Sequence, residues 1–295
     1  MIKSSESEDL RGRYQRVIEN IDNLPSLPAI VTKLLQIVNS ADSSADDAAV
    51  LIQKDPALTS KMIRLANSAF YGIPRSISSV NSAVVILGFN TIRSLVLSAS
   101  VMKMFSGPKY QAINKERFWK HSVVCAMCAR IIVRYFMNIR MMDPESAFCA
   151  GILHDIGKLI FNEFAYEDYM DACEYARKYS VPLIEAESRM LGTNHAEIGK
   201  ILSDKWALPL DLEYCLVYHH NPGGADNISE LVATVHLADV IAHQIGAKLW
   251  DDEYCEDEWE NTRTLLQITD DDFKKIMNTV SENLERSDEF INIIT

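Results

Sequence analysis

The sequence predicts an all-α protein. Apolar residues recur along nearly all of the 295-residue chain with the helical spacing of about 3.6, and the alternation typical of strands is rare. Glycine and proline, at 11 and 9 residues, are few and fall at the ends of the periodic segments, so long loops should be rare. These observations together favour a bundle of helices joined by short connections.

Periodic apolar spacing divides the first part of the chain into separate helices. Pro25 and Pro28 precede the second of them, and Asp55-Pro56 places a proline at the first position of another. The segment Gly72-Ile-Pro74 ends that helix and begins a loop. The helices expected in this part cover about 7–20, 28–40, 45–53, 56–68, 77–87 and 90–105.

The second part of the chain has the same helical spacing. Its strongest stop signal is Asn221-Pro-Gly-Gly224. The acidic stretch WDDEYCEDEWENTRT, residues 250–264, is typical of a solvated face or loop. The helices expected here cover about 114–137, 145–161, 165–179, 182–191, 195–206, 210–220, 228–246 and 270–290.

Composition and charge exclude several classes of protein. Hydrophobic residues make up 48% of the chain, as in a soluble globular protein, and the net charge of −12 argues against a general nucleic-acid binder. No run of 18 apolar residues occurs, and the N-terminal sequence MIKSSESEDLRGRYQ has no signal-peptide core. We therefore expect a cytoplasmic protein with no nucleic-acid partner and no membrane partner. The six cysteines do not form a disulfide framework, and the C-x2-C pair Cys125 and Cys128 lies in a helical pattern typical of core residues.

Histidine usage divides the chain into two predicted lobes. Residues 1–120 contain no histidine, and all seven lie between 121 and 243. This boundary predicts an N-terminal helical lobe over 1–112 and a second lobe with the histidine and aspartate site over 113–295. Because no Gly/Ser-rich segment joins them, the lobes should share an apolar interface.

The motif GILHDIGK, residues 151–158, places ionisable side chains inside an apolar segment. Such groups need a partner or a metal ion when they are buried. Together with histidines and an aspartate on other predicted helices, they form a set of nitrogen and oxygen ligands suited to one or two ions of Fe, Mn, Zn or Ni. His236 and His243 are weaker candidates and are more typical of core residues. The candidate metal ligands are His121, His154, Asp155, His195, His219, His220 and Asp239.

Two neighbouring residues of this motif can serve one site. Adjacent helical residues point about 100° apart, so His154 and Asp155 could both contact an ion between them, with Asp155 bridging two ions. Lys158 comes four residues after His154 and would share its helix face. Lys158 and Asp155 are therefore the candidate catalytic residues, because a lysine beside a metal can bind a phosphate oxygen.

Several motifs in order resemble the HD superfamily of metal-dependent phosphohydrolases: FWKHS, AGILHDIGK, HAEIGKILSDKWALP, VYHHNP and VHLADVIAH. The H…HD…D pattern of that superfamily falls on His121, His154, Asp155 and Asp239, and the resemblance implies an all-helical fold. His195, His219 and His220 are similar to the residues that hold a second metal in the HD-GYP branch. The N-terminal motifs LPSLPAIVTKLLQIV, LIQKDPALTSKMIRLANSAFYG and ISSVNSAVVILGFNTIRSLVLS resemble the HDOD family, the HD-related output domain of bacterial signalling.

The resemblance leaves three functions open. An HDOD-type signalling protein would act through binding a protein or ligand, with little or no catalysis. A metal-dependent phosphohydrolase or phosphodiesterase would use the complete ligand set and Lys158. A third alternative is a module that binds a nucleotide second messenger without turnover. The loop HHNPGGADN lacks the GYP sequence, which argues against cyclic-di-GMP hydrolysis and favours the first function, with an unknown signalling protein or a nucleotide as partner.

Overall fold

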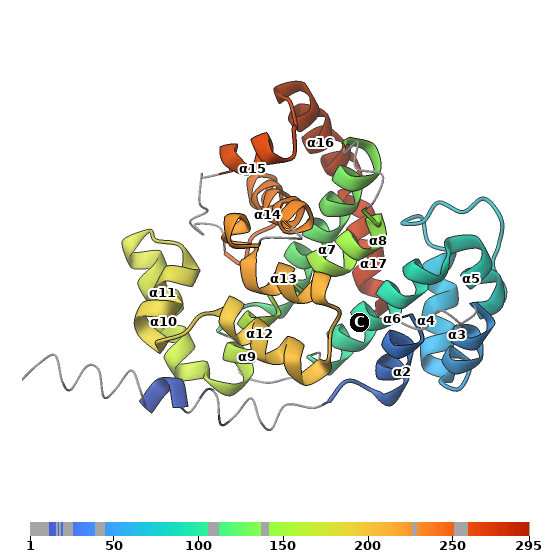
Figure 1. Cartoon of the computed structure of the whole chain (residues 1–295), viewed down its shortest axis with the longest axis horizontal. Helices are drawn as coiled ribbons and strands as arrows, with labels where there is room; N and C mark the ends of the chain where they lie inside the picture. Colours follow the sequence, from blue (N-terminus) through green and yellow to red (C-terminus); the bar gives the residue numbers. More distant parts are fainter. Residues whose placement is uncertain are drawn as a thin grey trace, which may run out of the picture.

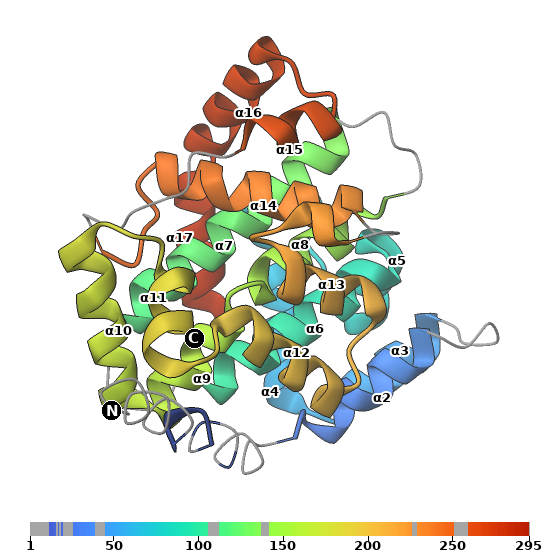
Figure 2. The same ribbon diagram turned by 60° about the vertical axis from the view of Figure 1, so that its left-hand side comes forward.

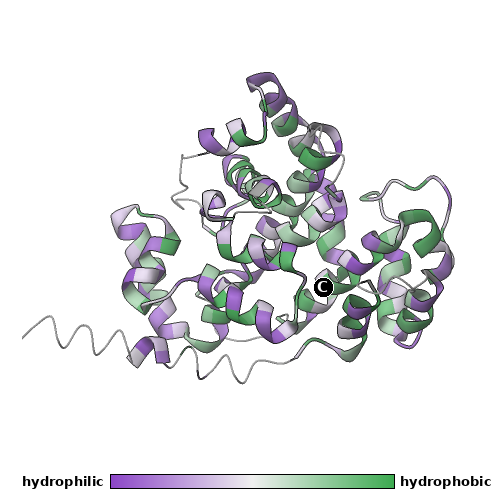
Figure 3. Ribbon diagram, in the orientation of Figure 1, coloured by the Kyte–Doolittle hydropathy of each residue, from purple (hydrophilic) through white to green (hydrophobic). Residues whose placement is uncertain are grey.

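The computed structural model describes residues 12–15, 17, 19, 26–38, 45–105, 112–136, 142–225, 229–250 and 259–294. Within these ranges the chain forms 16 α-helices and no strand (Figure 1), which confirms the predicted fold class. The expected helix 7–20 lies largely outside the described residues. Hydrophilic residues are frequent on the outer helices α10 (Tyr166–Tyr179), α15 (Glu260–Leu265) and α16 (Asp270–Glu282), as Figure 3 shows.

The N-terminal helices gather at one side of the molecule (Figure 1). Asp55 begins one of them by accepting a hydrogen bond from Leu58 N at 3.0 Å, with Pro56 at the first helical position, as the sequence predicted. Gly88, at φ 88°, joins the last two helices at an angle of 118°. These helices are α2 (Ala29–Val38), α3 (Ala45–Ile52), α4 (Pro56–Ala66), α5 (Val80–Leu87) and α6 (Phe89–Met104).

A long buried helix, α7 (Lys115–Ile131), lies at the centre of the remaining helices (Figure 2). It continues into a π-helical turn, η1 (Ile132–Phe136). The helices α8 (Pro144–Leu153), α14 (Ser229–Gln244) and α17 (Leu284–Ile294) pack directly against α7. Further out lie α9 (Ile156–Phe164), α11 (Leu183–Leu191), α12 (His195–Trp206), α13 (Leu210–Tyr218) and the short η2 (Pro222–Gly224).

The C-terminal helix α17 also contacts α4 and α6 of the N-terminal group. The rings of Phe70, Phe148 and Phe290 meet at this contact, with centroids 4.9 to 5.5 Å apart. Lys61 Nζ donates a hydrogen bond to the carbonyl oxygen of Ile294 in the same region. The contact between the N-terminal helices and the rest is thus apolar and extensive, while the division at residue 112 stays a prediction.

Two expected helices differ from the structure. The helix expected over 145–161 is interrupted at His154 and Asp155, and the one over 270–290 at Asn283. The acidic stretch, expected to be a solvated face or loop, ends in the largely exposed helix α15; residues 251–258 lie outside the described ranges. Trp259, just before this helix, stacks on Phe273 with ring centroids 4.5 Å apart. Both rings are partly buried against the core and so hold the start of this helix in place.

None of the described helices alone has the length and apolar character needed to cross a membrane. Taken together, the bent pair α5 and α6 meets the requirement for a membrane span by length and composition only. Eleven residues of α6 are buried by neighbouring helices, as in the core helix of a folded domain.

Candidate metal centre

The interruption between α8 and α9 carries His154 and Asp155. Glycines flank it because two other helices come very close: a Cβ on Gly151 would lie 2.5 Å from Ala126 Cα in α7, and a Cβ on Gly157 would lie 2.0 Å from the carbonyl oxygen of His195 in α12. No residue with a side chain fits at such a distance. The two glycines therefore bring α7 and α12, with their histidines, against the HD motif.

One group of candidate ligands joins α7, the interruption and α14. His121, His154 and Asp239 each offer one ligand atom, and these atoms all lie within 4.8 Å of one another. His121 Nε2 lies 3.4 Å from His154 Nε2 and 3.0 Å from Asp239 Oδ1. All three residues are buried.

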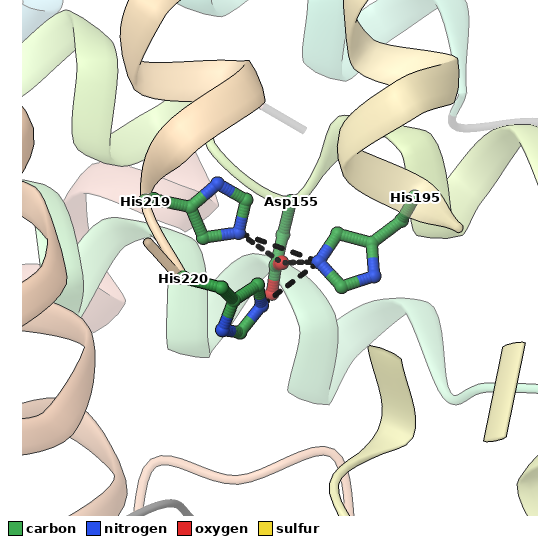
Figure 4. A group of neighbouring side chains, drawn as sticks. All are labelled: Asp155, His195, His219 and His220. Carbon is green, nitrogen blue, oxygen red and sulfur yellow. Dashed lines mark hydrogen bonds and ion pairs between the residues drawn. The ribbon is translucent and has the colours of Figure 1, made fainter. Parts of the chain in front are cut away.

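The second group joins the interruption to α12 and to the end of α13 (Figure 4). It contains Asp155, His195, His219 and His220, again with ligand atoms within 4.8 Å of one another. His195 Nε2 lies 3.3 Å from His219 Nε2 and 3.0 Å from His220 Nε2. Asp155 Oδ1 lies 3.3 Å from His195 Nε2 and 3.6 Å from His219 Nε2.

Asp155 contacts both groups through its two carboxylate oxygens. While Oδ1 faces the second group, Oδ2 lies 3.3 Å from His154 Nε2 and 3.6 Å from His121 Nε2. One carboxylate placed between two sets of imidazoles is the arrangement of a bridging ligand. The structure therefore brings all seven candidate residues into one centre with room for two ions, and their role as ligands remains a prediction.

In three of these imidazoles, the hydrogen bond made by Nδ1 shows how Nε2 is used. Nδ1 donates to the Ala247 carbonyl in His121 and to the Gly151 carbonyl in His154, both at 2.8 Å. In His219 it donates to the Cys215 carbonyl at 3.0 Å. Since a carbonyl oxygen can only accept, Nδ1 carries the proton and Nε2 presents a lone pair to the centre in the neutral ring.

The donor set fits a divalent transition-metal ion. Without a proton or cation between them, the Nε2 lone pairs 3.0 to 3.4 Å apart repel one another. Asp155 Oδ1 and Asp239 Oδ1 are buried without a hydrogen-bond partner among the described residues. A cation among these atoms would satisfy both the nitrogen and the oxygen lone pairs.

Electrostatics at the centre favours the protonation states of ligands in four of the residues but the protonated ring in His154. Burial lowers the pKa of His195, His219 and His220, so these rings are neutral at pH 7. The pKa of Asp155 is well below its usual value because His154 and Lys158 outweigh the effect of burial. Burial alone would lower the pKa of His154, but Asp155 outweighs this effect and raises that pKa. His154 therefore carries a second ring proton, which a bound cation would displace.

Sequence reasoning missed Glu187 in α11. Its side chain is fully buried, and Oε2 accepts hydrogen bonds from His195 Nδ1 at 2.6 Å and from the His195 backbone N–H at 2.9 Å. The available signal was its position: it lies four residues from both Leu183 and Leu191, on the apolar face of the helix. A glutamate on that face needs a partner, and the partner is a candidate ligand.

Lys158 meets the centre through Asp155, although the helix expected to carry it with His154 is interrupted. Its Nζ donates to Asp155 Oδ2 at 2.7 Å, the same oxygen that lies 3.3 Å from His154 Nε2, and its catalytic role stays a prediction. His236 and His243 are buried core residues, as expected, and both contact the centre. His236 Nδ1 donates to the His219 carbonyl at 2.7 Å, and His243 Nδ1 lies 3.1 Å from Asp239 Oδ1.

The fold and this paired histidine and aspartate centre together define a protein of the HD superfamily type. The HDOD domain family matches residues 24–222, more than half of the chain. The chain belongs to the HDOD family.

Solved structures agree with this assignment. An HDOD domain protein of unknown function from Geobacter sulfurreducens is 25% identical, with 97% of this chain and 99% of that chain covered and a TM-score of 0.77. A protein from Shewanella amazonensis described as a candidate phosphohydrolase is 26% identical, with 95% and 98% covered and a TM-score of 0.73.

An uncharacterized protein of Treponema pallidum is 25% identical over 227 residues. The match covers 76% of this chain and 43% of that protein, so the chain spans less than half the length of this relative.

Proposed function

We propose that this protein is an HDOD-type signalling output protein whose centre binds two divalent transition-metal ions and supports protein or ligand binding, with weak or no phosphohydrolase activity. The observation that carries the proposal is the burial of a complete ligand set. The side chains of His121, His154, Asp155, His195 and His219 are at most 1% exposed. The partner would be a signalling protein or a nucleotide, in the cytoplasm.

The remaining exposure at the centre is small and lies on one side. The Asp239 side chain is 12% exposed, and His220 is partly buried. A phosphoester that meets the centre would have to approach past these two residues. Ligands buried this deeply would hold an ion and link α7, the interruption between α8 and α9, α12, α13 and α14, whereas a substrate needs open coordination positions.

The basic residues near the motifs also support a binding role. Lys158 is 4% exposed and its ammonium group is held by Asp155. Lys120 pairs with Asp288, and Lys200 lies 2.6 Å from Asp204 and 3.1 Å from Glu213. These cations are engaged by carboxylates and are poorly placed to bind an incoming phosphate.

Phosphoester hydrolysis is the second candidate function. The position of Asp155 between two sets of imidazoles favours it, because a pair of metal ions lowers the pKa of a water molecule and neutralises phosphate charge. The residues that would hold one ion are His121, His154 and Asp239, and those for the other are His195, His219 and His220, with Asp155 between them. The Shewanella protein described as a candidate phosphohydrolase is consistent with this function.

One experiment separates the two functions. The protein is loaded with Mn, Fe or Zn, its metal content is measured, and it is offered an aryl phosphodiester, cyclic-di-GMP and a panel of nucleotides. We expect about two ions per chain and turnover far below about 1 s⁻¹. Asp155→Asn should lose metal, whereas the exposed control Asp271→Asn should keep it. Turnover of about 1 s⁻¹ or more that disappears in Asp155→Asn would favour the hydrolase, and a chain that takes up no metal would contradict both.

A further inference from the structure

A second hollow, which we call the arginine pocket, lies between the N-terminal and C-terminal helices. Its volume is about 230 Å³. It is lined by Phe70 and Tyr71 after α4, by Arg130 at the end of α7 and Arg134 in η1, and by Arg286 in α17. Arg130 comes nine residues after His121 in the same run of helix, which places it about 14 Å further along the axis. The arginine pocket is therefore separate from the metal centre.

The charge of the arginine pocket is opposite to that of the whole chain. Its lining includes three arginines and no carboxylate, although the chain has a net charge of −12. Arg130 NH1 lies 3.8 Å from Glu145 Oε1, a loose ion pair just behind the wall. Arg134 and Arg286 are exposed and form no ion pair with any residue that the structure describes. Two exposed positive charges therefore line this hollow and favour an anion, although Arg134 also attracts the buried carboxyl group of Glu145.

The aromatic wall holds one arginine rigidly. The Arg130 guanidinium lies 4.2 Å from the ring centre of Phe70, 5.3 Å from that of Tyr71 and 5.2 Å from that of Phe148. Arg130 is only 8% exposed, so its rotamer is already fixed before a ligand binds. Tyr135, which is 67% exposed, adds a ring at the rim.

The polar groups of the wall have unused hydrogen-bonding capacity. The hydroxyl of Tyr71 is buried without a hydrogen-bond partner in the described part of the chain. Asn283, also in the lining, uses Nδ2 to donate to the Thr279 carbonyl at 2.6 Å, and its side-chain oxygen stays available to accept. Buried polar groups in this state are uncommon in folded proteins and often mark a binding site.

We propose that the arginine pocket binds a nucleoside monophosphate. Arg134 and Arg286 would bind the phosphate, because a guanidinium pairs with phosphate oxygens through two parallel hydrogen bonds. The planar base would lie against the rings of Tyr71 and Tyr135, where stacking does not require a particular base. A volume of about 230 Å³ is smaller than the usual range for whole drug-sized ligands of about 300 to 1,000 Å³, which favours a mononucleotide over a dinucleotide.

Such a ligand would contact segments far apart in the chain. Phe70 and Tyr71 follow α4, while Arg286 belongs to α17, and α4 and α17 pack together. A ligand that binds only the folded arrangement of these segments stabilises it by mass action. The nucleotide would thus strengthen the contact between the N-terminal helices and the C-terminal helix.

Isothermal titration calorimetry on the full chain, with metal bound and again after its removal by chelator, tests this proposal. The probes are AMP, GMP, CMP and UMP, with adenosine and inorganic phosphate as partial ligands. We expect at least one monophosphate to bind, and Arg134→Ala and Arg286→Ala each to weaken it about tenfold or more, since each removes a charge-assisted hydrogen bond. Both arginines are exposed, so the variants should fold. Arg189→Ala, which removes an exposed charge from the distant α11, is the matched control and should bind normally.

Four results would overturn the proposal. The first is that no monophosphate binds at millimolar concentration, and the second is that adenosine or inorganic phosphate binds as tightly as the monophosphates. The third is that the arginine variants bind normally. The fourth is that binding requires metal and is lost in Asp155→Asn. The last result would place the nucleotide at the metal centre. Because the titration is run with and without metal, binding at the arginine pocket is distinguished from binding at the metal centre, whether or not the metal centre catalyses hydrolysis.

Discussion

Glu187 Oε2 lies 2.6 Å from His195 Nδ1, and both side chains are fully buried. The carboxyl oxygen accepts a hydrogen bond from Nδ1–H of His195. The lone pair of His195 Nε2 is therefore directed toward Asp155, 3.3 Å away. Burial raises the pKa of Glu187 to about 8 and lowers that of His195. The pair therefore fixes both the tautomer and the orientation of one candidate ligand.

Replacing Glu187 should weaken the ion held by His195, His219 and His220. At about pH 9, above its raised pKa of about 8, Glu187 is a carboxylate, which accepts more strongly than the amide oxygen of Glu187→Gln. We therefore expect metal affinity at this group to fall about 10- to 100-fold at that pH. The measurement is metal content after dialysis against graded chelator. The first ion, at His121, His154 and Asp239, should remain. Glu185→Gln, two residues away and exposed, is the control; equal metal loss in both variants would contradict the role of Glu187.

Gly157→Ala should disrupt the centre through the backbone of another helix. A Cβ at residue 157 would lie 2.0 Å from the His195 carbonyl oxygen, so the start of α12 must move and carry His195 with it. We expect a loss of about 3 kcal/mol or more in the free energy of unfolding, the upper end for overpacking. Urea unfolding and metal content of the variant measure the two effects.

Gly199→Ala is the matched comparison within α12 itself. The added Cβ would lie 3.1 Å from Leu216 Cβ, so the two helices need to separate by only a few tenths of an ångström, far less than at Gly157. Alanine also favours the helix by about 1 kcal/mol. We therefore expect a change near zero in the free energy of unfolding. A similar large loss in both variants would show that the close approach at Gly157 is not the cause.

The sequence predicts the helices well because burial of one face sets their apolar spacing. Local start signals help too: at Asp55-Pro56 the signal in the sequence agrees with the start of α4. It does not predict the interruption at His154 and Asp155, because the surrounding residues are apolar and helical in character. That interruption depends on Gly151 and Gly157 meeting α7 and α12, contacts between residues distant in the chain. The candidate ligands were found because histidine is rare here, while Glu187 is one glutamate among many.

The buried cysteines should resist alkylation in the folded protein. Burial raises the pKa of the Cys149 thiol to about 12 and raises that of Cys128 and Cys215 well above the ordinary value. The reactive thiolate is therefore scarce at pH 8, and reagent access is blocked. Peptide mass spectrometry after treatment with iodoacetamide should find these three cysteines unmodified in native protein and modified in guanidinium. Alkylation of Cys149 at equal rates in both conditions would contradict this prediction.

Glu145 should make stability fall as pH rises. Its side chain is buried, and although Arg130 and Arg134 act in the opposite direction, burial raises its pKa above the ordinary value of 4.5. The folded chain therefore binds more protons than the unfolded chain from pH 4.5 upward to the raised pKa, and the free energy of unfolding decreases across that window. This contribution is fully present below the ordinary pKa and is lost as pH rises through the folded-state pKa.

Glu145→Gln isolates this effect, because the amide has the same size and does not titrate. The backbone carbonyl of residue 145, which accepts a hydrogen bond from Ser94 Oγ at 2.9 Å, is unchanged. The variant loses the ion pair with Arg130, a cost that is greatest where Glu145 is charged. Since charged Glu145 is the disfavoured form, we expect the stability of Glu145→Gln relative to the wild type to increase with pH. Urea unfolding of metal-free protein at several pH values between about 5 and 8 measures this difference. The exposed control Glu116→Gln should show no trend, and a difference for Glu145→Gln that stays flat or falls with pH would mean that its carboxyl group titrates normally in the fold.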